Sequence, residues 1–263
     1  MKSIKIIKKI TWYLLRPKYY LQLIILIYKK ISLKFSTKSI NENLKWCKEN
    51  SLTTKEALHK ITGNNTYIPI STKYSEIFSN ANDKIDKINV RMGGSSNLDL
   101  IYYCCEYLNA TRVVETGVSY GWSSLSILLS LNKRKDSKLV STDMPYPGLN
   151  SEKFVGIAIP KELKKNWVLF SEADIYSIPK ALNSFDSIDV CHYDSDKYYE
   201  GRKWAYPKLW ASLRKGGIFI SDDIENNSAF REFVMKVQRT PIIVRLKNNN
   251  KSEGFQYNGI LIK

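Results

Sequence analysis

Short apolar runs separated by amphipathic segments dominate the chain from residue 98 onward. The runs have the length of buried strands and lie at 112–117, 138–143, 167–170, 188–193 and 218–221. The segments around them predict helices at 98–108, 121–131, 199–213 and 228–237. Two further runs, at 242–246 and 259–262, have no helix between them and predict an antiparallel hairpin at a sheet edge. The pattern therefore predicts a doubly wound α/β fold with a mostly parallel, seven-stranded sheet.

The first 40 residues form a distinct basic segment. They contain ten of the 41 Lys and Arg residues and no Asp or Glu, so most of the net charge of +16 belongs to them. Their two apolar stretches, 10–15 and 19–28, are separated by Arg16-Pro17-Lys18. Neither stretch reaches the roughly 20 apolar residues that a spanning helix needs, and no small-residue cleavage site of a secretory signal is present. We interpret residues 1–40 as a basic, amphipathic helical arm.

This arm has two interpretations. It fits a segment that lies on an anionic membrane surface, with Trp12, Tyr13, Tyr19 and Tyr20 at head-group level. Alternatively, its apolar face packs on the body of the chain or on a second subunit of a homo-oligomer. Nucleic acid is not expected as a partner, because the basic charge comes without a recognition motif. We expect a cytoplasmic protein, attached peripherally to the inner face of the membrane under the first interpretation.

The segment between the arm and the regular pattern is more polar. Residues 41–66 predict short helices, with Thr53 or Thr54 as an N-cap and Glu56 completing a loose capping box. Residues 67–97 predict a connecting stretch or a lid. The four cysteines have no metal-binding spacing and indicate buried free thiols in a reducing compartment. The chain is thus divided into an arm at 1–40, a helical and loop cap at 41–97 and a ligand-binding domain at 98–263.

A glycine-containing loop follows the first strand of the regular pattern. The residues from Glu115 to Gly121 have the spacing E-x-G-x-x-x-G. Glycines at these positions let the backbone approach a ligand and turn tightly into a helix. The spacing differs from the G-x-G-x-x-G of dinucleotide-binding proteins, and no Lys-Ser or Lys-Thr pair of a P-loop follows. A turn that uses glycine for packing alone is the alternative.

Asp143 ends the second strand of the pattern. It lies about 20 residues beyond the glycine loop, the distance at which this architecture places an acid near a ribose. A carboxylate there can accept hydrogen bonds from both ribose hydroxyls. The alternative is a solvated loop acid. Together, the loop and Asp143 predict a ligand that contains a nucleoside.

More acidic residues gather where the next two central strands end. Asp194 follows the fourth predicted strand, and Asp222 and Asp223 follow the fifth. Three carboxylates at one sheet edge repel one another unless a cation or raised pKa values compensate, and a divalent cation such as Mg²⁺ takes oxygen ligands of this kind. The alternative is that Asp222 and Asp223 hydrogen-bond loop amides. Lys197 is a candidate general base beside them, or an ordinary surface lysine in a lysine-rich chain.

With these motifs in this order, the chain resembles the class I S-adenosylmethionine-dependent methyltransferases over about residues 90–263. The segments that carry the resemblance are 114–123, 141–145, 188–196 and 213–223. It is most similar to a bacterial group associated with sugar and polysaccharide biosynthesis and related to macrocin-type sugar O-methyltransferases. The resemblance implies a Rossmann-like fold and S-adenosylmethionine as cofactor. It also implies a set of cofactor-binding residues: Glu115, Gly117, Ser119, Gly121, Ser123, Asp143 and Asp174.

A second, local resemblance concerns the residues after the fourth strand. The segment 194–199 is similar to the loop of metal-dependent catechol and caffeoyl-CoA O-methyltransferases, in which the first Asp binds Mg²⁺ and the Lys is the base. It implies that Asp194, Asp222 and Asp223 bind the metal and that Lys197 and Asp194 are catalytic. Two positions depart from the patterns of these families. Those enzymes have Asp-Asn where this chain has Asp222-Asp223, and macrocin-type enzymes place His where Lys197 stands.

We therefore expect an S-adenosylmethionine-dependent O-methyltransferase, assisted by a divalent metal, that acts on a sugar, glycan or glycolipid hydroxyl. One alternative is a metal-independent enzyme that methylates nitrogen or a carboxyl group of a small molecule. Another is a non-catalytic, membrane-associated binding protein that keeps the fold. An RNA methyltransferase is a further alternative, for which the chain has neither a base-methylation motif nor a separate RNA-binding module.

Overall fold

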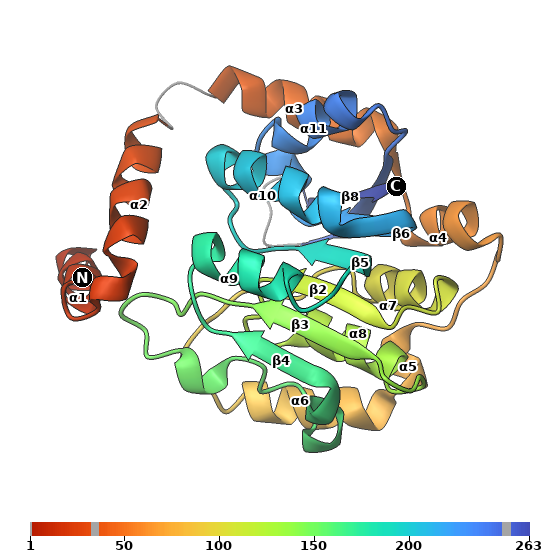
Figure 1. Cartoon of the computed structure of the whole chain (residues 1–263), viewed down its shortest axis with the longest axis horizontal. Helices are drawn as coiled ribbons and strands as arrows, with labels where there is room; N and C mark the ends of the chain where they lie inside the picture. The colour runs from red at the N-terminus through yellow and green to blue at the C-terminus, as the bar shows by residue number, and fades with distance from the viewer. Residues whose placement is uncertain (1, 33–36, 249–253) are drawn as a thin grey trace.

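In the computed structural model, which describes residues 2–32, 37–248 and 254–263, an eight-stranded sheet forms the centre of the molecule (Figure 1). The strand order is β1-β7-β8-β6-β5-β2-β3-β4. The strands are β1 (Ser51–Leu52), β2 (Arg112–Thr116), β3 (Lys138–Thr142), β4 (Trp167–Phe170), β5 (Ile188–Tyr193), β6 (Leu213–Ser221), β7 (Ile242–Lys247) and β8 (Phe255–Ile262).

The strand directions agree with the predicted fold. Neighbouring strands are parallel, except that β8 runs antiparallel to both β6 and β7. The doubly wound α/β fold and the hairpin of the last two strands are confirmed. To the seven predicted strands the structure adds β1, whose two residues pair with Ile243 and Val244. A strand of two residues gives no apolar run, so the sequence pattern did not reveal it.

Two layers of helices cover the two faces of the sheet. One layer consists of α4 (Thr54–Thr62), α5 (Ile70–Lys73), α6 (Ser75–Ile85), α7 (Leu98–Tyr107) and α8 (Trp122–Leu131). The other consists of α3 (Thr37–Asn50), α9 (Asp174–Leu182), α10 (Tyr199–Ser212) and α11 (Ala229–Val237). Successive strand residues point into opposite layers: Val113 belongs to the first core and Val114 to the second. Because both faces are buried, the central strands are apolar almost throughout.

The region before β2 contains more helix than its polar sequence predicts. The capping box of α4 is confirmed, since Thr53 and Glu56 each accept the backbone N–H of the other. The composition of 67–97 predicts a connecting stretch, but α5 and α6 lie there. α6 packs on the core through Phe78, whose ring stacks on Trp122 with 5.6 Å between the ring centroids, and through Ala81. Ile77 and Ile85 are partly buried against the same core, so the apolar positions do have helical spacing, within a segment whose other residues are polar.

The arm forms two helices that break where Arg16-Pro17-Lys18 predicts. These are α1 (Lys2–Leu14) and α2 (Tyr20–Ser32), joined through the short 3₁₀ helix η1 (Pro17–Tyr19). Figure 1 shows both at the left, beyond the arrowheads of the parallel strands. No helix among the described residues is long and apolar enough to cross a membrane.

The aromatic residues of the arm lie differently from the arrangement expected at a membrane. Trp12, Tyr13 and Tyr19 are buried in a small cluster with Ala173, which lies just before α9. They are therefore not available at head-group level, and only Tyr20 of the four is exposed. The arm packs on the rest of the protein through these buried rings. This is the packing on the body of the chain that the second interpretation of the arm described.

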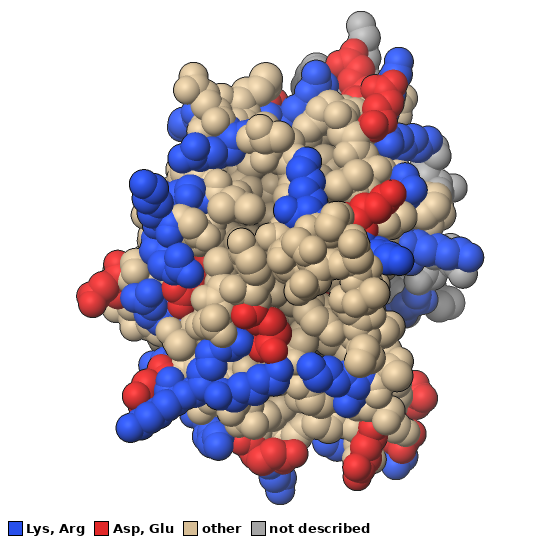
Figure 2. Space-filling model, turned by 90° about the vertical axis from the view of Figure 1, so that its right-hand side faces the viewer, with Lys and Arg blue, Asp and Glu red and all other residues tan. Residues whose placement is uncertain are grey.

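The cysteines and the charges on one face of the molecule can be compared with the sequence. The four cysteines are free and buried, as predicted. Figure 2 shows the face at the right of Figure 1, where the parallel strands begin, with Lys and Arg mostly around its margin and a largely uncharged middle. The basic side chains of this face are therefore not gathered into one patch.

A buried carboxylate ties together the first residues of three central strands. Asp189 in β5 accepts the backbone N–H groups of Thr111 and Arg112, both at 2.9 Å, and the guanidinium groups of Arg112 at 3.1 Å and Arg214 at 2.7 Å. Burial alone would raise the pKa of Asp189, but these hydrogen bonds outweigh it and lower the pKa to about 2. The ionised carboxylate is thus favoured by the folded state, at the end of the sheet where the parallel strands begin.

We expect Asp189→Asn to lower the free energy of unfolding by about 2 kcal/mol at neutral pH, because it removes the charge from these hydrogen bonds. A lowered pKa stabilises the fold above the ordinary carboxyl value near 4, and this stabilisation is lost as the pH falls toward about 2. The difference from wild type should therefore shrink across that range in urea unfolding curves. Asp186→Asn, on an exposed neighbour, is the control. Equal effects of the two variants would contradict the assignment.

Candidate active site

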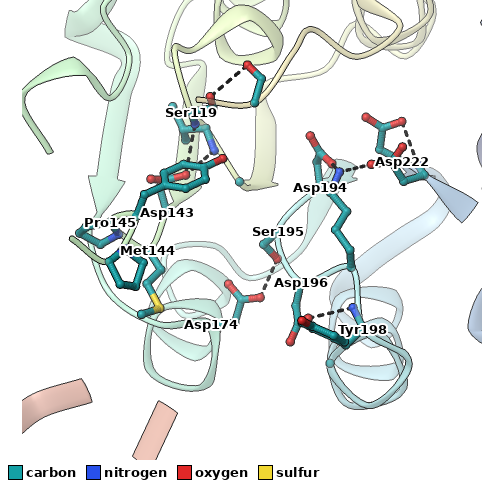
Figure 3. A pocket seen from close by; sticks show the side chains of 18 of the residues that line it. Ser119, Asp143, Met144, Pro145, Asp174, Asp194, Ser195, Asp196, Tyr198 and Asp222 are labelled. Carbon is teal, nitrogen blue, oxygen red and sulfur yellow. Dashed lines mark hydrogen bonds and ion pairs between the residues drawn. The ribbon is translucent and has the colours of Figure 1, made fainter. Parts of the chain in front are cut away.

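A cavity of about 1170 Å³ lies where the parallel strands end, the place at which ligands bind to sheets of this kind. The turns that leave β2, β3, β5 and β6 line it, and residues of α1 and α2 form part of its wall. Figure 3 shows Asp143, Met144 and Pro145 on one side and Asp194 and Asp222 on the other. The acidic residues that the sequence singles out at the ends of β3, β5 and β6 therefore face one space.

Backbone hydrogen bonds hold these strand ends in register. Just past the strands, four amides donate to the carbonyl at the end of the neighbouring strand: Asp143 to Phe170 (3.1 Å), Gly117 to Thr142 (2.7 Å), Asp194 to Thr116 (2.8 Å) and Asp222 to Tyr193 (2.9 Å). The sheet ladder thus continues by one residue beyond each strand. As a result, hydrogen bonds to the sheet fix the backbone positions of Gly117, Asp143, Asp194 and Asp222.

The glycine loop turns tightly between β2 and α8. Gly117, Ser119 and Gly121 all have left-handed backbones, with φ of 82°, 53° and 91°. A Cβ on Gly117 would lie 2.5 Å from the carbonyl oxygen of Asp194, so only glycine allows the β2 and β5 ends to meet this closely. Gly117, Ser119 and Ser123 line the cavity. Gly121 does not, and a Cβ there would meet Gly156, so its role is the packing role of the alternative interpretation.

Glu115 does not reach the cavity, although its motif predicts cofactor binding. Its carboxylate is fully buried and accepts the hydroxyls of Ser124 at 2.5 Å and Ser141 at 2.7 Å. The Nδ1 atom of His192, also fully buried, lies 3.7 Å from it. The structure therefore corrects this assignment: Glu115 belongs to a polar cluster inside the protein, between the sheet and α8.

Asp143 has one carboxylate oxygen engaged and the other free. Oδ1 accepts the N–H groups of Val118 at 2.8 Å and Ser119 at 3.2 Å. Oδ2 is buried and has no hydrogen-bond partner among the described residues. Burial, with a smaller contribution from Glu115, raises the pKa of Asp143 to about 6 against the effect of the two amides. An acceptor oxygen with no partner is costly to bury, so this oxygen is suited to a hydroxyl donor from a ligand.

Asp174 also lines the cavity, at the first residue of α9. Its carboxylate accepts the Ser195 hydroxyl at 2.6 Å, and that hydroxyl lies 3.0 Å from Thr116 Oγ1 (Figure 3). Through Ser195, Asp174 is linked to the ends of β5 and β2. Asp174 and Asp143 line the same cavity. The structure thus brings together Asp143, Asp174 and three of the loop residues predicted to bind a cofactor.

Across the cavity, Lys197 lies among the three aspartates. Its ammonium group forms ion pairs with Asp194 and Asp223. Burial lowers the pKa of Lys197, but the charges of Asp194, Asp222 and Asp223 outweigh burial and raise it above its ordinary value. Lys197 therefore keeps its proton at neutral pH in this arrangement, which argues against the expected role of general base.

Asp194 is the better placed of the two expected catalytic residues to accept a proton. Burial raises its pKa to about 7, and Asp222 and Asp223 add to the rise while Lys197 opposes it. A carboxylate with a pKa near the working pH is a more effective general base than an ordinary one.

Asp222 is held by amide groups. Its Oδ1 accepts the N–H of Asp223 at 3.0 Å, the side chain of Gln256 at 2.7 Å and the side chain of Asn258. The fully buried guanidinium of Arg202 donates to the carbonyls of Asp222 at 3.0 Å and Asp223 at 2.9 Å, which places a positive charge beneath the acids. These contacts are of the kind expected under the loop-amide alternative.

The three aspartates do not converge on one position as metal ligands would. Lys197 already contacts two of them, and Asp222 is turned toward its amide partners. Within residues 2–32, 37–248 and 254–263, no group of three or more His, Cys, Asp or Glu side chains is placed to hold a metal ion. In this arrangement the lysine supplies the compensating cation, so the residues do not fit Mg²⁺.

Comparison with known families agrees with this architecture. Residues 114–224 match the family model described as a methyltransferase domain. The match covers 111 of the 263 residues of this chain. The expectation of a methyltransferase enzyme is confirmed by this match, which contains the ends of β2, β3, β5 and β6. None of the curated proteins matches the chain.

Solved structures share the fold of the methyltransferase domain and its flanking elements. An O-methyltransferase from Bacillus cereus in complex with SAH is 12% identical, with a TM-score of 0.56, and the match covers 82% of this chain and 100% of the other. The O-methyltransferase TomG from Streptomyces achromogenes, involved in tomaymycin synthesis and in complex with SAM, is 14% identical, with a TM-score of 0.50. That match covers 72% of this chain and 88% of the other.

The sequence pattern does not reveal several residues that lie in or near the cavity. Arg202 is a single arginine within a helix, which carries no local signal. Gln256 and Asn258 are two residues apart in β8 and therefore share a face, but they lie before the apolar run at 259–262 that revealed this strand. The arm contributes Tyr13 and Leu23 from outside the domain. These contacts join segments far apart in sequence.

We expect Gly117→Ala to lower the free energy of unfolding by about 3 kcal/mol, because it combines left-handed strain with a clash against the Asp194 carbonyl. Gly63→Ala is a matched control, since Gly63 has a similar φ of 78° and no atom lies within 4 Å of the position that its new methyl group would take. Strain alone should cost it about 1–2 kcal/mol. Urea unfolding measures both, and equal losses would refute the close approach of the β2 and β5 ends.

Proposed function

We propose that this chain transfers the methyl group of S-adenosylmethionine to a hydroxyl group. The observation that carries the proposal is the shared cavity, which has the free oxygen of Asp143 on one side and the Asp194–Lys197 pair on the other. The methyltransferase domain and the fold shared with O-methyltransferases bound to SAH or SAM support the same chemistry.

The residues at the β2 and β3 ends suit the nucleoside part of S-adenosylmethionine. The buried Oδ2 atom of Asp143 would accept a ribose hydroxyl, and the left-handed glycine at 117 leaves the backbone open to the ligand. Ser119, Ser123 and Asp174 add polar groups to the same part of the wall. When bound, S-adenosylmethionine supplies a methyl group activated by its sulfonium.

The acid cluster suits the acceptor hydroxyl. Asp194 would take the proton of that hydroxyl, because burial raises its pKa toward neutrality. The Lys197 ammonium, held by Asp194 and Asp223, would stabilise the negative charge that develops on the oxygen. No nucleophilic side chain is required, since the transfer needs orientation more than covalent catalysis.

We propose a sugar, glycan or glycolipid as the acceptor, on the basis of the sequence resemblance to the sugar-associated group. The volume of about 1170 Å³ exceeds the range of about 300–1,000 Å³ that is usual for a single small ligand, which leaves room for an acceptor beside the cofactor. A metal-assisted reaction, as the sequence suggests, would require Lys197 to leave its two aspartates. We therefore favour the metal-independent form.

Two measurements test the proposal. Isothermal calorimetry with S-adenosylmethionine should give saturable binding, and absence of binding at millimolar concentration would leave the non-catalytic alternative. Mass spectrometry should then detect a transferred, isotope-labelled methyl group on one member of an acceptor panel of free sugars, nucleotide sugars, an alkyl glycoside and a catechol. Labelling of the catechol alone would overturn the sugar assignment while keeping O-methylation.

We expect Asp143→Asn to bind S-adenosylmethionine about 10- to 100-fold more weakly, because the amide cannot replace a charged acceptor at the ribose. The wild-type affinity should also fall as the pH drops below about 6, since Asp143 is then protonated and loses the charge that binds the hydroxyl. Calorimetry between pH 7.5 and pH 5 would measure both. The variant should show no such pH dependence, and Asp186→Asn should behave as wild type. A variant that binds normally would exclude Asp143 from the site.

We expect Asp194→Asn to lower the methyl-transfer rate by about 10²–10⁴-fold, the range typical of a lost general base. Its affinity for S-adenosylmethionine should stay close to that of wild type, because Asp194 lies across the cavity from Asp143. The rate should survive treatment with EDTA. If EDTA abolishes activity and Mg²⁺ restores it, the metal-assisted alternative is correct and Lys197 must move.

A further inference from the structure

Between Tyr20 and Ile27, the exposed side chains of α2 that the structure describes are apolar, which is unusual for a helix that faces solvent. Tyr20, Leu21, Ile24 and Ile27 are 43%, 42%, 63% and 53% exposed and follow one another along one side of the helix. Leu23 is a neighbour of Ile27 on the helix surface, and it is partly buried against the small cluster of Trp12, Tyr13 and Tyr19. The apolar stripe of α2 therefore begins at Leu23, where the helix meets the rest of the protein, and continues outward through the exposed side chains.

The end of α1 and the residue after it extend this surface. Ile10, Leu14 and Leu15 are 47%, 59% and 72% exposed. Seven of the fourteen large apolar side chains that are exposed among the described residues lie between residues 10 and 27, so they are concentrated on the arm and not scattered. We name this surface the apolar face of the arm, made of Ile10, Leu14, Leu15, Tyr20, Leu21, Ile24 and Ile27.

The arm is docked on the body, so the apolar face has a fixed position. Trp12, Tyr13 and Tyr19 are buried beneath it. The Tyr19 hydroxyl donates to the carbonyl of Ser171 at 3.3 Å, and Arg16 lies 4.0 Å from the Glu152 carboxylate. The exposed apolar side chains are thus not the ones that hold the arm in place, and they remain free for another partner.

The charge of the arm indicates what that partner is. The arm has ten basic residues and no acidic one. Lys8, Lys9 and Lys18 are exposed and belong to the same segment of chain as the apolar face, residues 8–27. The side chains of the other arm lysines lie outside the described residues: Lys2, Lys5, Lys29, Lys30, Lys34 and Lys38. A second copy of the chain docking here through a two-fold axis would bring two such clusters together, and like charges would oppose it. An anionic lipid surface satisfies both the charge and the apolar side chains.

The apolar face also adjoins the mouth of the cavity. Ile10 and Ile27 are exposed and at the same time line the cavity, together with Lys9. We propose that α1 and α2 seat the protein on an anionic bilayer, with the mouth of the cavity at the lipid surface. If the proposed methyl transfer is correct, the acceptor hydroxyl then belongs to the head group of a membrane amphiphile.

Flotation with lipid vesicles tests the docking without any need for activity, so its failure is distinct from failure of the proposed function. Wild type should float with vesicles of phosphatidylcholine and phosphatidylglycerol, and at least about tenfold less with phosphatidylcholine alone or at high salt. Leu21→Gln/Ile24→Gln should lose about tenfold or more of the binding. The matched control Ile68→Gln/Met235→Gln removes two side chains of 58% and 61% exposure elsewhere and should bind as wild type.

Site-specific fluorescence tests the orientation. All four native cysteines are buried, so a single exposed cysteine can be labelled selectively with an environment-sensitive dye. Labels at Ile24→Cys and Ile27→Cys should brighten on addition of anionic vesicles, and a label at Met235→Cys should not. Failure of wild type to float, or equal losses in both double variants, would overturn the proposal. A dimer in sedimentation velocity that Leu21→Gln/Ile24→Gln dissolves, without vesicle binding, would assign the face to a second copy.

Discussion

The parallel backbone ladder that continues past the strand ends is the constraint on which the rest of the site depends. Each amide beyond β2, β3, β5 and β6 is bonded to the last carbonyl of the strand beside it, so the four exits form a row with fixed spacing. Side chains that begin in this row cannot drift apart without breaking hydrogen bonds that are buried in the sheet. The close approach of Gly117 to the Asp194 carbonyl is one consequence. The facing of Asp143 and Asp194 across one cavity is another.

The two sides of the cavity treat their buried acids differently. On one side, Asp143 has backbone amides on one oxygen and no partner among the described residues on the other, which leaves that oxygen available to a donor. On the other side, Lys197 compensates Asp194 and Asp223 directly. The unpaired oxygen of Asp143 favours a bound hydroxyl group, whereas the carboxylates of Asp194 and Asp223 already have a charged partner in Lys197. The Asp143 side of the cavity is therefore suited to binding the ligand, and the Asp194 side to exchanging a proton.

The sequence was sufficient for what depends on local pattern. Continuous apolar runs identified the strands because both faces of the sheet are buried, and the residues after those runs include Asp143, Asp194 and Asp222. The sequence was insufficient where a contact between distant segments determines the position or the role of a side chain. Glu115 sits in a favourable motif, yet its side chain points into the protein interior. Lys197 was predicted to be a base from its position after Asp194 and from the resemblance of segment 194–199. Its two carboxylate partners follow different strands, so their joint effect on its pKa is visible only in the fold.

The two-residue strand β1 has an effect on how the chain can reach this structure. It pairs Ser51 with Ile243 on β7, and among the described residues β7 is joined to the rest of the sheet through β8 alone. On a ribosome, the early segment would emerge long before its partner exists. Residues 51 and 52 cannot pair until β7 and β8 have been synthesised and have formed the hairpin. Contacts of such long sequence separation form slowly, so we expect the pairing of β1 with β7 to be a late event in folding.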